Sequence, residues 1–185
     1  MNETVTTTTW AIAPETKQAM LNLCRRTKVN NVELGMILPV VNNEVIAGPT
    51  KWGSPNYLML DPLETPFGAF HTHPGEKAPE LSDPDMMCLL LNDPCLFIGV
   101  GNPNHNFARV AAKRKPVGSE LKKSWVPLYI EWLTLPRSTL SKPGGPIEGI
   151  GQYFRDYTIY LDDARTSYIK TVIPAAGCRE IKAGV

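Results

Sequence analysis

The most informative part of the chain is the stretch Phe70-His71-Thr72-His73-Pro74, followed at close range by Ser82-Asp83-Pro84-Asp85. The apolar residues before the histidines predict a strand that runs into them. Side chains two positions apart in a strand point to the same face. His71 and His73 are therefore expected to point the same way, so that two imidazoles can reach one metal ion.

The second segment has the pattern of a helix start. Ser82 fits the N-cap, Pro84 lies in the first turn, and Asp85 completes a capping box three residues after the cap. This helix would bring the Asp85 carboxylate to the histidines after 11 intervening residues. The same pattern is also that of an ordinary capping box with no chemical role, and the sequence leaves both interpretations open.

Two imidazole nitrogens and one carboxylate oxygen match a catalytic zinc site, which typically has three protein ligands and keeps a fourth position for water. Zinc polarises carbonyls and lowers the pKa of bound water, so amide hydrolysis is the natural reaction class. Only one further histidine exists, His105, and it is expected at the surface in a turn. This count disfavours the amidohydrolase barrels and the metallo-β-lactamases, which also open with H-x-H but need more histidines.

Composition predicts a soluble cytoplasmic protein of one domain. The 185 residues carry 19 Lys plus Arg and 18 Asp plus Glu, so the net charge of +1 gives no reason to expect nucleic acid or a membrane as partner. The four cysteines form no C-x-x-C pair, which favours reduced thiols over a disulfide framework or a zinc ribbon. No apolar run approaches the length of a spanning helix. The oligomeric state is not indicated.

Periodicity and turn residues predict a mixed α/β (α+β) chain with a core over residues 1–117 and an extension over 118–185 that packs on the same domain. The elements expected in the core are a helix over Pro14 to Arg26, a hairpin around Asn42-Asn43, and strands at Tyr57 to Leu60, Phe67 to Phe70, Leu96 to Val100 and Phe107 to Ala112. The extension is expected to hold a helix over Leu121 to Leu135 interrupted near Pro127, a Gly/Pro loop at 141–146, and a hairpin of Tyr157 to Leu161 with Thr166 to Ile173.

Taken together, the two opening segments resemble the JAMM (MPN+) motif of the JAB-domain zinc metalloproteases: H-x-H-P, a short spacer, S-x-x-D, and an upstream glutamate. The resemblance covers about residues 10–115, and the order of elements also fits. It implies an MPN/JAB-like mixed, curved sheet flanked by helices, and Zn²⁺ bound by His71, His73 and Asp85. It also implies that Ser82 helps to stabilise the tetrahedral intermediate.

The upstream glutamate of this resemblance is Glu33, in Val32-Glu33-Leu34-Gly35, which would be the general acid/base acting on the zinc-bound water. The glycine follows two residues later here, where three is usual in the family, and Glu64 is the second candidate for the base. The spacer between Pro74 and Ser82 has seven residues, one more than the common form. A loop absorbs such an insertion easily.

Family members cleave peptide or isopeptide bonds, often at the C-terminus of ubiquitin or a ubiquitin-like protein, while others act on sulfur-carrier proteins or occur in phage proteins. The resemblance thus implies a zinc metallopeptidase or isopeptidase with a protein or peptide substrate. The alternative is a non-catalytic MPN-like interaction scaffold in which residues 118–185 form the working surface.

Overall fold

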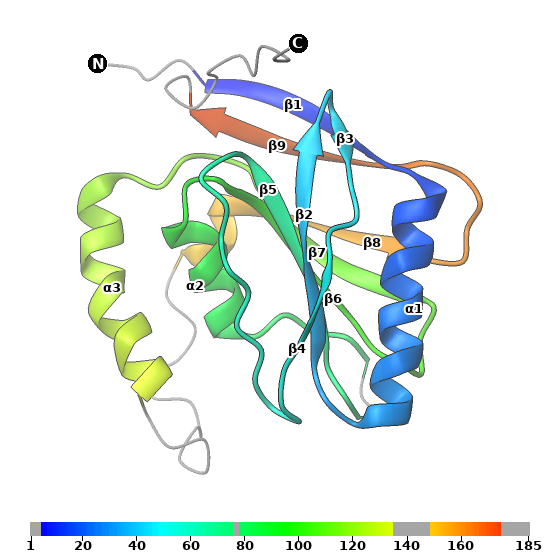
Figure 1. Ribbon diagram of the computed structural model, residues 1–185. Helices are drawn as coiled ribbons and strands as arrows, with labels where there is room; N and C mark the ends of the chain where they lie inside the picture. Colours follow the sequence, from blue (N-terminus) through cyan, green and yellow to red (C-terminus); the bar gives the residue numbers. More distant parts are fainter. Residues whose placement is uncertain (1–4, 76–77, 135–148, 175–185) are drawn as a thin grey trace.

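The computed structural model describes residues 5–75, 78–134 and 149–174 (Figure 1). In these ranges the chain forms one curved, nearly closed mixed sheet with three α-helices, which confirms the prediction of a mixed α/β chain. The helices are α1 (Pro14–Asn30), α2 (Asp83–Leu91) and α3 (Ser119–Thr134), and a 3-10 helix, η2, spans Ile150–Tyr153. None of these helices is long and apolar enough to cross a membrane.

Within the described part of the chain the sheet has nine strands: β1 (Val5–Ile12), β2 (Leu34–Val41), β3 (Glu44–Val45), β4 (Thr50–Trp52), β5 (Phe67–Thr72), β6 (Cys95–Gly101), β7 (Phe107–Lys113), β8 (Phe154–Tyr160) and β9 (Ser167–Pro174). Their order is β8-β7-β6-β5-β2-β3-β1-β9, and β4 branches off by pairing with β2. β5 pairs antiparallel with β2 and parallel with β6. It therefore lies in the middle of the sheet, where every residue of the strand is buried.

The helices cover opposite faces of the sheet, α1 on one side and α2 with α3 on the other (Figure 1). β5 contributes to both cores because its side chains alternate: Phe70 packs into the core under α1, while Phe67 and Ala69 pack into the core under α2 and α3. By the same alternation, His71 and His73 belong to the face covered by α2.

The predicted hairpin near the C-terminal end is wrong in its pairing. Both strands exist, but β8 pairs with β7, and β9 pairs with β1 over eight residue positions. Partner choice follows burial: β9 places Ile169 in the core, and the Thr171 hydroxyl accepts a hydrogen bond from the Trp10 indole at 2.7 Å. Strands from the 118–185 segment thus belong to the same sheet as the strands of residues 1–117.

Two smaller predictions are corrected. Tyr57 to Leu60 is not a strand, since only an isolated bridge from Ser54 to Tyr57 forms there, and the pairing with β2 is made by β4. α3 runs through Pro127 without interruption. Pro127 is exposed, so water can satisfy the carbonyl that loses its partner, while the buried Trp125 holds the helix on the core. The predicted loop at 141–146 lies outside the described residues.

Candidate metal centre

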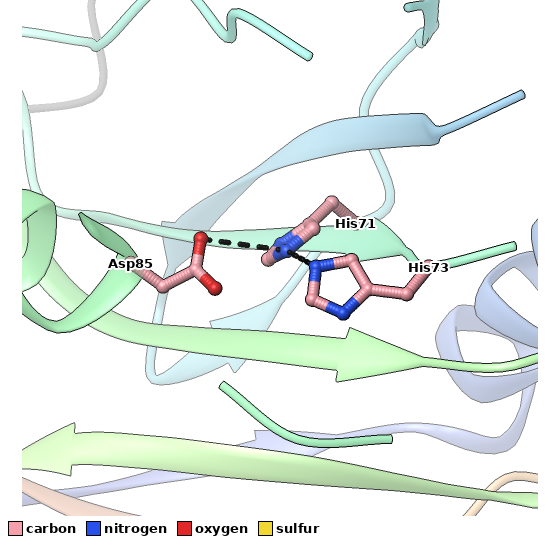
Figure 2. A group of neighbouring side chains, drawn as sticks. All are labelled: His71, His73 and Asp85. Carbon is pink, nitrogen blue, oxygen red and sulfur yellow. Dashed lines mark hydrogen bonds and ion pairs between the residues drawn. The ribbon is translucent and has the colours of Figure 1, made fainter. Parts of the chain in front are cut away.

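The end of β5 presents the two histidines to α2. Thr72, between them, points to the opposite face, where its hydroxyl hydrogen-bonds with the Thr27 hydroxyl of α1 and with the backbone of Leu34. These bonds fix the orientation of the strand end, because a one-residue shift would exchange the faces of all three side chains. His71 and His73 consequently lie on one side, as the sequence pattern predicts (Figure 2).

The first turn of α2 holds Asp85. Both the backbone N–H and the hydroxyl of Ser82 donate to Asp85 Oδ2, at 2.8 and 2.7 Å, and the predicted capping box is confirmed. The other oxygen, Oδ1, lies 3.4 Å from Nε2 of His71. The two interpretations of Ser82-x-x-Asp85 are therefore compatible, since one oxygen caps the helix while the other faces the histidines.

The donor atoms of the three side chains all lie within 4.8 Å of one another, and His71 Nε2 is 3.0 Å from His73 Nε2 (Figure 2). Two ligands bound tetrahedrally to zinc at about 2.0–2.1 Å lie roughly 3.3 Å apart. The distances from His71 Nε2 to His73 Nε2, 3.0 Å, and to Asp85 Oδ1, 3.4 Å, bracket this value. The donor set of two nitrogens and one oxygen could therefore hold a metal ion such as zinc, with a position left open.

The electrostatic surroundings shift the pKa values of the two histidines in opposite directions. Burial alone would lower the pKa of His71, but the Asp85 carboxylate, with help from Glu33, raises it above its usual value. The pKa of His73 falls to about 4 because of burial and the neighbouring His71 charge. Burial opposes ionisation of Asp85, yet His71 and the Ser82 donors hold its pKa well below the usual range. A positive charge is thus favoured between His71 and Asp85, where a metal ion would provide it.

Glu33 lies next to this group. It precedes β2, and its backbone bonds to Ser54 and Gly53 of the segment after β4. Because Gly35 pairs with His71, Glu33 falls on the same face two residues earlier, and its charge contributes to the raised pKa of His71. Glu64 is exposed and is not among the charges that shift the pKa values of the three candidate ligands. The structure therefore favours Glu33 over Glu64 as the carboxylate beside the site.

Comparison of the chain with protein-family models, curated proteins and solved structures gives no match. The chemistry that the site allows is therefore judged from its ligand atoms alone. Two imidazoles with one carboxylate suit zinc in hydrolases and also iron(II) in oxygenases. A second carboxylate, Glu33, is close enough for its charge to raise the pKa of His71, and a carboxylate can accept and donate protons.

Sequence reasoning missed Asn102, which supports the histidine turn. Its side chain is buried, and its amide donates to the carbonyls of His73 and Gly75 at 3.3 and 2.9 Å, while its oxygen accepts from the backbone of Asn104. The sequence showed only a turn at this position, and no local signal distinguished Asn102 within it. His105, in the same turn, packs against Phe107 and is not part of the candidate metal group.

Proposed function

We propose that this protein is a zinc-dependent hydrolase of peptide or isopeptide bonds, a JAMM-type metallopeptidase on an MPN/JAB-like fold. The observation that supports it is the convergence of His71, His73 and Asp85 on one face of the sheet, with Glu33 beside them. Cytoplasmic location is part of the proposal, because the described cysteines are free thiols.

Each residue then has a defined task. Zinc, when bound by His71, His73 and Asp85, supplies Lewis acidity and makes water a stronger acid. Glu33 accepts a proton from the attacking water and delivers it to the leaving amine. Asp85 is oriented for binding by Ser82, which occupies its second oxygen.

The proposed role of Ser82 in stabilising the oxyanion requires its hydroxyl proton to change direction. Its one hydroxyl proton is donated to Asp85 Oδ2 in this structure. For Ser82 to stabilise the oxyanion, that proton has to turn towards the substrate carbonyl, and the backbone N–H of Ser82 then remains as donor to Asp85. The oxyanion role is therefore compatible with the ligand role of Asp85.

The substrate that suits the site is a protein with an extended tail, such as the C-terminus of a ubiquitin-like or sulfur-carrier protein. β4 pairs with β2 and, among the described strands, with no other, so a tail can add to its outer edge. Gly53, directly after β4, donates to the carbonyl of Glu33. A tail paired with β4 would therefore lie one strand away from the segment that carries the proposed general base.

The test measures metal content and cleavage together. Protein purified without a His tag should contain about one zinc per chain, and it should cleave ubiquitin-like or sulfur-carrier fusions in a screen. His73→Ala should lose both zinc and activity, whereas Glu33→Gln should keep zinc and lose activity. Glu64→Gln is the matched control and should behave as wild type.

Absence of zinc, with no activity on adding it, would contradict the proposal, and iron in its place would point to oxygenase chemistry. Bound zinc without cleavage of any substrate would favour the non-catalytic scaffold. A structural zinc site normally has four protein ligands. The three found among the described residues therefore favour the enzyme over the scaffold.

A further inference from the structure

The two histidines of the candidate metal centre are held by different parts of the fold. His71 lies within β5 and is paired on both sides, with β2 and with β6. β5 ends one residue before His73, so this second histidine stands just outside the strand. Its N–H donates to the carbonyl of Gly101 at 3.0 Å, and Pro74, the next residue, has no N–H to donate. The position of His73 therefore depends on the turn that follows β6.

The side chain of Asn102, in the turn between β6 and β7, holds the chain around His73. Its amide nitrogen, Nδ2, donates to the carbonyls of His73 and Gly75 at 3.3 and 2.9 Å. Its oxygen, Oδ1, accepts from the backbone N–H of Asn104 at 2.8 Å. Because a backbone N–H can only donate, this third bond fixes which end of the amide is the oxygen. Asn102 is only 2% exposed, so water competes little for its bonds.

These bonds leave the histidine turn little freedom. The carbonyls of His73 and Gly75 lie on either side of Pro74, and a proline restricts the residue before it to extended backbone. With that restriction, the two bonds fix the direction in which the chain leaves the sheet. The ring nitrogen of His73 is at the far end of its side chain, so a small rotation of the backbone displaces it further. Metal sites tolerate about 0.5 Å of such displacement.

We propose that Asn102 is a positioning residue of the metal centre: its bonds to the carbonyls of His73 and Gly75 set the direction in which His73 faces the other two ligands. This inference rests on the proposed metal function and gives the turn between β6 and β7 a part in it. Asn102 acts through the backbone of His73 and is not itself a ligand. His71 does not need this support, because the sheet holds it on both sides.

The experiment measures zinc affinity by competition with a chelating dye. Asn102→Asp keeps the size of the side chain and the bond from Asn104, but its carboxylate has no proton to donate to the two carbonyls. Zinc affinity should fall about tenfold, at the lower end of the 10- to 100-fold loss typical when a partner of a metal ligand is removed. The added negative charge alone would favour a cation, so a loss reports orientation. Asn102→Ala should show a similar loss.

Two control variants separate orientation from stability. Asn104→Ala removes the other side-chain donor to the Gly75 carbonyl but leaves the bond to His73, so it should bind zinc as wild type. Thr171→Val removes the acceptor of the Trp10 indole in β9, a strand that does not pair with β5. It should lower the melting temperature and still bind zinc as wild type. The visible spectrum of the Co²⁺-substituted protein should change in Asn102→Asp and in neither control.

Unchanged zinc affinity in both Asn102 variants would overturn the positioning role. An equal loss in Asn104→Ala would also overturn it, because the effect would then arise at Gly75 and not at His73. An equal loss in Thr171→Val would do the same, since lost stability would then be the cause. Each of these outcomes leaves the proposed function intact. Wild-type protein that binds no zinc would instead overturn both.

Discussion

At the scale of single residues, zinc binding at mildly acidic pH should displace a proton from one of the two histidines and not from the other. The pKa of His71 is raised and that of His73 lies at about 4, so at pH 5–6 His71 carries a proton and His73 does not. A proton must leave before the metal binds, and zinc affinity should therefore fall about tenfold per pH unit below the His71 pKa. Calorimetry in buffers of different ionisation enthalpy should find one proton released. Release of two protons near pH 6 would contradict this assignment.

Gly35 faces the site because it pairs with His71, and its lack of a side chain admits the loop before β5. A Cβ there would lie 2.3 Å from Leu58 Cδ2 and 2.8 Å from the Phe70 carbonyl. Gly35→Ala should therefore cost about 1–3 kcal/mol of unfolding free energy and weaken zinc binding. Denaturant unfolding checks this, with Gly118→Ala as control because nothing lies near its Cβ position. Equal stability of the two variants would show that the loop moves aside freely.

At the scale of elements, the start of α2 combines a cap with a ligand. Ser82→Ala removes the hydroxyl that donates to Asp85 Oδ2, and it should lower the unfolding free energy by about 1 kcal/mol. It should also weaken zinc binding, since Asp85 loses one of the donors that hold it. Ser124→Ala in α3, at an exposed serine, is the control and should change neither quantity. Lost stability with unchanged zinc affinity would mean that the cap and the ligand act independently.

At this scale, the sequence predicts the features that depend on neighbouring residues. The shared face of His71 and His73 followed from strand alternation, and the start of α2 followed from its capping pattern. The partners of β8 and β9 did not, because two neighbouring strands read as a hairpin unless distant partners are known. Asn102 was missed for the same reason, since it acts across the fold on residues far away in sequence.

At the scale of the whole molecule, β1 and β9 complete the sheet through a buried bond between Trp10 and Thr171. Trp10→Phe removes the indole donor and leaves a void and an unpaired hydroxyl. It should lower the unfolding free energy by about 2–4 kcal/mol. Trp52→Phe, at an exposed position, should change it by less than about 0.5 kcal/mol. Similar losses in both variants would show that the junction of β1 and β9 adds little to stability.

The pairing of β1 with β9 also has a consequence for synthesis. Trp10 and Thr171 are 161 positions apart, so at about 5–20 residues per second β1 leaves the ribosome roughly 10–30 s before its main partner. During that time the one other partner of β1 among the described strands is β3, which pairs with it over two residues. An unpaired strand edge invites aggregation, and the threonines at positions 6–9 make this waiting strand polar. The threonine run thus suits a strand that must remain soluble until β9 has been synthesised.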